Sequence, residues 1–146
     1  MSKKVSKARR ITAELRRIAS SNGGLLLPQD VVDAARPKTS VLHSRFEWDD
    51  DKAAESYRLW QARQLIRVTV EMLPGIAAPT EVFVSLTPDR NANRGYRIVT
   101  DVLSDAQLRQ IMLEDAVAEL EVFKTKYARL RQLAVVFQAI RKVKRK

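Results

Sequence analysis

The stretch HSRFEWDDDKAAESYRLWQARQLIR, residues 43 to 67, combines the chain's only histidine with three consecutive aspartates and several arginines. Carboxylates are ligands that Mg²⁺ prefers, so one hypothesis is a magnesium-dependent nuclease that uses Asp49, Asp50, Asp51 and Glu55. Consecutive aspartates point in different directions, however, and the sequence has no second acidic cluster to complete such a site. The nuclease is therefore the weaker interpretation of this stretch.

A structural interpretation explains the same charges. We predict a helix from about Asp50 to Arg67, in which the three aspartates cap the first turn and the cations Arg63 and Arg67 suit the last turn. The chain has no cysteine nucleophile that a histidine could activate. We therefore expect His43 to be a hydrogen-bonded structural histidine.

On a helical wheel the same helix has two apolar faces and a polar stripe. The apolar residues are Ala53, Tyr57, Trp60 and Leu65 on one face and Leu59, Ala62 and Ile66 on the other, with Phe46 and Trp48 packing at the helix entry. We expect this helix to be buried on two sides. The stripe of Ser56, Arg63 and Arg67 could contact phosphates and base edges, or could be a solvated stripe on a structural helix.

Other catalytic or cofactor sites have no signature in this sequence. With no cysteine, the chain can form neither disulfides nor thiolate zinc sites. It also lacks a glycine-rich phosphate loop, a metal-ligand spacing and a recognisable catalytic triad. We expect a non-enzymatic protein with no catalytic residues, no cofactor and no metal.

The elements that would position these residues begin with two helices. SKARRITAELRRIASSNGG places Ala8, Ile11, Leu15 and Ile18 at helical spacing and ends in Asn-Gly-Gly, which tolerates a left-handed helix stop. LLLPQDVVDAARP follows, with a proline suited to a first helical turn and Pro37 after its end. This pattern predicts a second helix of about two turns.

Beyond the third helix the period changes from helical to alternating. RVTVEML, EVFVSL and YRIVTDV are rich in β-branched and aromatic residues, and PGIAAPT and TPDRNANRG between them are turn signals. We predict three short antiparallel strands and an α+β fold. The predicted order is three helices followed by a sheet that contains a hairpin. This is the element order of a winged helix-turn-helix domain, although domains that bind no nucleic acid also have it.

The last segment, from Ser104 to the end, contains no glycine or proline. Its apolar residues step by three and four without a break, which predicts a coiled-coil helix of nearly forty residues that needs a partner. The oligomerisation residues predicted on this seam are Leu113, Leu120, Phe123, Tyr127, Leu130 and Phe137. The predicted domains are a body over residues 1–103 and an oligomerisation helix over residues 104–146.

The basic charge lies at the two ends of the chain. The formal net charge is +10, and residues 1–17 and 129–146 are rich in lysine and arginine, so the middle of the chain is mildly acidic. The predicted nucleic-acid-binding residues are these terminal cations together with those of the third helix and the hairpin tip: Lys3, Lys4, Lys7, Arg9, Arg10, Arg63, Arg67, Arg90, Arg94, Arg141, Lys142, Lys144, Arg145 and Lys146. Charged arms of this kind also serve as solubilising tails or bind acidic protein surfaces.

The motif HSRFEWDDDKAAESYRLWQARQLIR, followed by FVSLTPDRNANRGYRIVTDVLSD and ELEVFKTKYARLRQLAVVF, resembles a family of small proteins of tailed bacteriophages and prophages. The resemblance covers roughly residues 22 to 140. It implies a phage setting, in the cytoplasm of an infected or lysogenic bacterial host, and gives no catalytic residues.

We expect, on these grounds, a phage-encoded protein that binds nucleic acid, double-stranded DNA in the first instance, and associates with itself. The alternative is a coiled-coil adaptor or virion assembly protein that binds a host or phage protein. Glu14, Arg16 and Arg17 interrupt any apolar signal segment, and no apolar run approaches the length of about 18 residues needed to span a membrane. We therefore expect no membrane partner.

Overall fold

The computed structural model describes residues 3–52 and 54–144, with side chains from residue 7 onward. The chain divides into two compact units, residues 1–102 and residues 103–146, called here the N-terminal unit and the C-terminal unit. The fold is α+β, as the sequence predicts. The N-terminal unit contains α1 (Lys3–Ser21), β1 (Leu25–Leu26), α2 (Pro28–Ala35), the 3-10 turn η1 (His43–Arg45), α3 (Glu55–Val68), β2 (Val70–Glu71), β3 (Thr80–Glu81), β4 (Phe83–Val84), α4 (Thr87–Asn91) and β5 (Tyr96–Ile98). The short helix α5 (Val99–Ser104) contains the boundary between the units.

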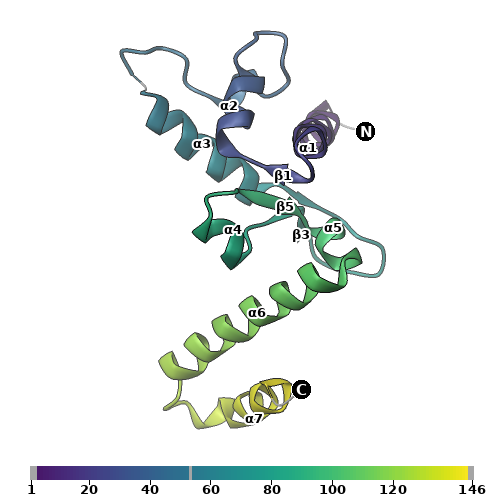
Figure 1. The fold of residues 1–146 in the computed structure, drawn as a ribbon, viewed down its shortest axis with the longest axis vertical. Coiled ribbons are helices and arrows are strands. Elements are labelled where there is room, and N and C mark those ends of the chain that lie inside the picture. Colours follow the sequence, from purple (N-terminus) through teal and green to yellow (C-terminus); the bar gives the residue numbers. More distant parts are fainter. Residues whose placement is uncertain (1–2, 53, 145–146) are drawn as a thin grey trace. The chain divides into compact units, whose positions relative to one another are not determined.

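The first two helices form where the sequence predicts them. In α1 the periodic residues Ile11, Leu15 and Ile18 are buried, and the helix stops where Gly24, at a positive φ of 87°, donates its N–H to the carbonyl of Ala19. α2 begins at its proline and packs against both α1 and α3. Figure 1 shows α2 beside α3, with α1 on the other side of α2. These three helices supply much of the core of the N-terminal unit.

The sheet is antiparallel, as predicted, and uses more strands than the sequence indicates. β1 pairs with β5, and β5 with β4, while β2 and β3 form a separate pair. The run EVFVSL is therefore divided between two sheets, and the apolar run before α2 contributes β1. A side chain at Gly95 would meet the carbonyl oxygen of Leu26 at 2.5 Å, so the close approach of β5 to β1 requires glycine there.

The connection between β4 and β5 contains a short helix, where the sequence predicts only a hairpin turn. α4 occupies this connection, and its Asp89 is only 2% exposed. The physical reason is that Arg97 of β5 donates two hydrogen bonds to the Asp89 carboxylate, at 2.6 and 3.0 Å. A buried, paired carboxylate holds the loop in a compact turn.

The predicted start of the third helix is wrong by several residues. α3 begins at Glu55, and its N-cap residue Ala54 makes no side-chain cap. Residues 49–52 form a turn instead, in which Lys52 N–H donates to the Asp49 carbonyl at 2.9 Å. The aspartates therefore do not cap α3, because the chain reaches the helix only after this turn.

The prediction that α3 is buried on two sides is also wrong. Ala62, Leu65 and Ile66 are buried in the core, whereas Tyr57 and Trp60 are 44% and 51% exposed. Ala53, assigned to the same face as Tyr57 and Trp60, lies outside the described residues. The packing partners α2 and β4 cover one face of α3.

The C-terminal unit is helical, as predicted, but the prediction of a single long helix is wrong. α6 (Ala106–Lys126) is followed by a turn, the 3-10 turn η2 (Arg131–Leu133) and α7 (Ala134–Lys144). The fold-back buries Phe137, whose ring packs edge-on to Phe123 with centroids 6.4 Å apart. An apolar seam that would be exposed on an isolated helix is thus covered in part by the chain's own end. Among the described residues no helix has both the length and the apolar character required to cross a membrane.

Candidate nucleic-acid interface

The motif with three aspartates is organised around Arg58, a buried arginine on α3. The residue is 5% exposed, and its Nε donates to the carbonyl oxygen of Glu47 at 3.0 Å. The guanidinium also pairs with Asp50 and, at 3.3 Å, with Glu55, and its carbon lies 5.3 Å from the centre of the Trp48 ring. Arg58 therefore fastens the segment before α3 onto the helix.

His43 supports the other side of this arrangement. Its ring stacks on Trp48 with centroids 5.0 Å apart and an interplanar angle of 6°, and Trp48 Nε1 donates to the His43 carbonyl at 2.7 Å. His43 Nδ1 lies 2.9 Å from the carbonyl oxygen of Ala35. Because a carbonyl only accepts, Nδ1 must be the protonated nitrogen. The prediction that His43 is hydrogen-bonded is confirmed.

Glu55 joins the same network to α2. It accepts hydrogen bonds from Gln29 at 3.1 Å and from Arg36 at 2.7 Å. These two bonds, followed by a weaker one from Arg58, lower the pKa of the Glu55 carboxyl. We call His43, Trp48, Asp50, Glu55 and Arg58 the Trp48 scaffold. Its carboxylates serve as ion-pair partners, and no cluster suited to a metal ion occurs among residues 3–52 and 54–144.

A groove of about 580 Å³ lies between the first half of α1 and the loop that precedes η1. Its lining residues are Lys7, Arg10, Lys38, Thr39, Ser40, Val41, His43 and Ser44. We call this site the basic groove, because three cations line it and no carboxylate does. Lys7 Nζ donates to Ser44 Oγ at 3.1 Å across the groove. Ammonium, guanidinium and hydroxyl donors around one hollow are suited to phosphate oxygens.

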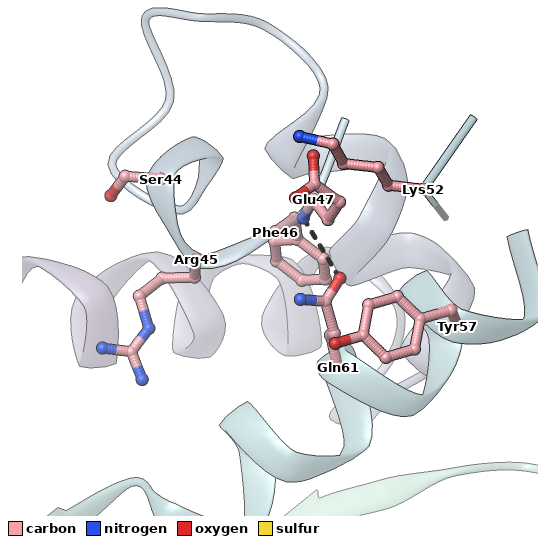
Figure 2. A pocket seen from close by; sticks show the side chains of 7 residues that line it. All are labelled: Ser44, Arg45, Phe46, Glu47, Lys52, Tyr57 and Gln61. Atoms are coloured by element: carbon pink, nitrogen blue, oxygen red, sulfur yellow. Dashed lines mark hydrogen bonds between the residues drawn. The ribbon is translucent and has the colours of Figure 1, made fainter. Parts of the chain in front are cut away.

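A second hollow, of about 320 Å³, adjoins the first at Ser44. Its lining residues are Ser44, Arg45, Phe46, Glu47, Lys52, Tyr57 and Gln61, which Figure 2 shows from close by. Gln61 Oε1 accepts a hydrogen bond from the backbone of Glu47 at 3.2 Å, so this wall is fixed. The Arg45 side chain extends away from the other lining residues in Figure 2. We call this site the Tyr57 hollow.

The exposed face of α3 continues from the Tyr57 hollow. The rings of Tyr57 and Trp60 stack on each other with centroids 5.7 Å apart and an interplanar angle of 13°. Arg63 and Arg67 are exposed on the same helix and have no ion-pair partner among the described residues. The predicted stripe of α3 is thus solvent-accessible, and it lies next to an exposed aromatic pair.

The predicted arginines of the hairpin tip are held by the protein itself. Arg90 donates to the Ser85 carbonyl oxygen at 2.5 Å, and Arg94 Nε lies 3.3 Å from the carboxylate of Asp89. Both side chains are exposed, but Arg94 is already paired with a carboxylate, and the Arg90 guanidinium is held by hydrogen bonds to the Ser85 carbonyl and the Thr87 hydroxyl. This tip is therefore a weaker candidate for phosphate contact than the sequence suggests.

The predicted residues of the basic arms are only partly brought together. Lys7 and Arg10 line the basic groove, and Arg9 is exposed on the same helix. The side chains of Lys3 and Lys4 lie outside the described set, as do Arg145 and Lys146 altogether. On α7, Arg141 and Lys142 are exposed, and Lys144 lies 3.6 Å from Glu121 of α6.

Sequence reasoning missed the loop residues of the basic groove. Lys38, Thr39, Ser40 and Ser44 carry no motif, and only the fold places them opposite α1. A single signal was present in the sequence, a loop rich in hydroxyls with a cation at each end, Lys38 and Arg45.

Comparison with family models, with curated proteins and with solved structures finds no match to this chain. The function must be inferred from the two hollows and the face of α3.

Proposed function

We propose that this chain is a non-enzymatic protein that binds nucleic acid through its phosphate backbone. The observation that carries the proposal is the basic groove, which is lined by Lys7, Arg10 and Lys38 without a carboxylate. Neither Arg10 nor Lys38 has an ion-pair partner among the described residues, so their charges are available to a ligand. Phosphate groups supply the negative charge that such a groove lacks.

Two further features support a phosphate backbone over a single small anion. Arg45 is exposed beside the groove, and Arg63 and Arg67 extend the positive charge along α3. A series of exposed cations along the surface suits a polymer of phosphates. Together with the resemblance to phage proteins, this charge makes a phage nucleic-acid-binding protein the function that we favour.

The winged-helix interpretation is part of this proposal. It is supported by three helices followed by an antiparallel hairpin, β4 and β5, whose second strand also pairs with β1. One feature departs from a compact helix-turn-helix, because residues 36–54 separate α2 from α3 where such motifs use a short turn of three or four residues. The Trp48 scaffold occupies that longer connection.

Self-association through the C-terminal unit completes the proposal. Only Phe137 and Ile140 are buried among the described residues of this unit. Large apolar side chains remain exposed on it, among them Leu113, Leu120 and Val135. Packing these faces together in an oligomer would bury them, and it would multiply weak phosphate contacts through avidity.

The same exposed apolar faces favour a second candidate function. A protein-binding adaptor or virion assembly protein would use the C-terminal unit to bind a host or phage protein instead of a second copy. In that case the basic groove would bind an acidic protein surface and the affinity for nucleic acid would be weak.

A mobility-shift titration with random duplex DNA at about 50 and 200 mM salt tests the first candidate. Replacing Lys7, Arg10 and Lys38 with alanine should weaken binding at low salt by at least about tenfold and flatten the salt slope by about 2 to 3, since each phosphate contact contributes about 0.9. The matched control replaces Arg17, Lys124 and Lys126, which lowers the net charge equally at sites outside the groove. Equal effects in the two variants would show that location does not matter and would contradict the proposal.

A further inference from the structure

Two large aromatic side chains lie in solvent on α3, where the sequence predicts burial. Tyr57 and Trp60 are 44% and 51% exposed, and their rings are nearly parallel. Aromatic rings of this size usually bury most of their surface, either in the core or against a ligand. The outer face of the Trp60 ring therefore has room for another flat group.

These rings are continuous with the basic groove. Ser44 lines both the basic groove and the Tyr57 hollow, and Tyr57 lines the hollow while stacking on Trp60. One strip of surface thus runs from the cations of α1 to the aromatic pair. The carboxylate in this strip is that of Glu47, which accepts a hydrogen bond from the Asp49 backbone at 3.2 Å.

Exposed arginines follow the aromatic pair along α3. Arg63 and Arg67 lie three and seven residues after Trp60, which places all three on neighbouring turns of one helix face. Positive charge therefore flanks the rings on both sides, from the basic groove and from the later turns of α3. Charge and flat apolar surface alternate along the strip.

We propose that this strip binds single-stranded nucleic acid, with phosphates in the basic groove and at Arg63 and Arg67 and with unpaired bases stacked on Tyr57 and Trp60. This inference rests on the proposed function and specifies its substrate class. In a duplex both faces of each base are covered by its neighbours, so an exposed aromatic ring gains little from double-stranded DNA. In a single strand the base faces are free, and stacking on aromatic rings combined with a cationic track is how such strands are bound without sequence preference.

A protein partner is the main competing ligand, because tryptophan, tyrosine and arginine are also enriched at protein interfaces. The cationic groove at the end of the strip favours nucleic acid, since it supplies phosphate-binding groups where a protein interface core is depleted in charge. If the strip binds a protein instead, replacing Tyr57 or Trp60 should not change the affinity for oligonucleotides.

The test measures fluorescence anisotropy of labelled oligonucleotides of about 20 nucleotides, which exceeds the site size of one domain. The full-length protein is titrated with single-stranded DNA, single-stranded RNA and duplex DNA of the same sequence. We expect a single strand to bind about tenfold more tightly than the duplex. The DNA and RNA arms then show which single strand is preferred.

Trp60→Ala should weaken single-strand binding by on the order of tenfold and leave duplex binding within about twofold. Val68→Ala, which removes an exposed apolar side chain from the end of the same helix, is the matched control and should change neither affinity. Trp60→Phe keeps a flat ring and should recover most of the affinity. Direct stacking should also quench tryptophan fluorescence in the wild type by more than in Trp60→Ala, which retains Trp48 alone.

The outcomes separate this inference from the proposed function. If the duplex binds as tightly as the single strands and Trp60→Ala alters neither, the strip does not stack bases and the inference fails, while nucleic-acid binding stands. If no oligonucleotide binds at low salt, the proposed function fails and this inference fails with it.

Discussion

Arg58 is a charged residue that the fold buries, and its partners come from several parts of one motif. It is held by the Glu47 carbonyl, by Asp50 and Glu55, and by the Trp48 ring. We expect Arg58→Ala to lower the midpoint of thermal unfolding by several degrees, because it removes the buried group whose hydrogen bonds hold the segment before α3 to the helix. Asp50→Ala should have a smaller effect, since the Asp50 carboxylate is largely exposed and Arg58 keeps its other partners.

Circular dichroism melts of the two variants check this order. Arg17→Ala is the control and should be nearly neutral, because Arg17 pairs with its neighbour Glu14 on the surface of α1 and with no other carboxylate among the described residues. Loss of a magnesium-dependent nuclease activity in Asp50→Ala, with the melting temperature intact, would instead revive the catalytic interpretation of the aspartates.

Glu55 gives the stability of the fold a dependence on pH. Hydrogen bonds from Gln29 and Arg36 lower its pKa from the usual 4.5. A folded-state pKa below the unfolded one means that the stabilisation is fully present above about pH 4.5 and is lost as the pH falls through the folded-state pKa.

Glu55→Gln should therefore be less stable than the wild type to urea at neutral pH, and the difference should shrink below about pH 4.5. Glu119→Gln, at an exposed position on α6, serves as the control. A difference that stays constant with pH would show that the charge of Glu55 does not contribute.

At the scale of elements, α4 depends on the buried carboxylate of Asp89. This carboxylate accepts two hydrogen bonds from Arg97 of β5 and also pairs with Arg94. Asp89→Ala should lower the free energy of unfolding by about 3 kcal/mol, as expected when one partner of a buried ion pair is removed. Equilibrium urea unfolding measures this loss, and Asp101→Ala, at an exposed position on α5, is a comparison of the same residue type. If Asp89→Ala kept full stability while nucleic-acid affinity rose, Arg94 would be a ligand-binding residue that Asp89 restrains.

At the scale of the whole molecule, the C-terminal unit leaves large apolar side chains exposed, among them Leu113, Leu120 and Leu130. We expect the full chain to form a dimer or higher oligomer, and replacement of Leu120 and Leu130 with aspartate to dissociate it by placing charges in the seam. Sedimentation velocity at concentrations on the order of tens of micromolar measures the change. Gln107→Asp with Gln132→Asp introduces the same charges outside the seam and should leave the oligomer intact. A monomeric wild type would favour an adaptor that binds a different protein.

Some elements could be predicted from the local sequence, whereas others depend on residues far apart in the chain. Ile11, Leu15 and Ile18 predict α1 because one face of a helix must be apolar, and Gly24 predicts its end because a left-handed stop suits glycine. The aspartates misled the prediction of α3, since a carboxylate near a helix start resembles a cap whether or not the chain has entered the helix. Asp50 instead faces Arg58, and no local pattern encodes that pair.

The sequence by itself determined the α+β class, the helices α1 and α2, the antiparallel pairing, the helical C-terminal segment and the concentration of charge at the ends. Each of these follows from spacing within a few residues, where the period of a helix or strand sets which side chains share a face. Tertiary structure decided the rest. It turned α7 back on α6, paired Arg94 of the hairpin tip with Asp89 and left Tyr57 and Trp60 exposed. It also brought Lys38 and Ser44 opposite Lys7, because contacts between residues far apart in the chain depend on the packing of whole elements, which local periodicity does not specify.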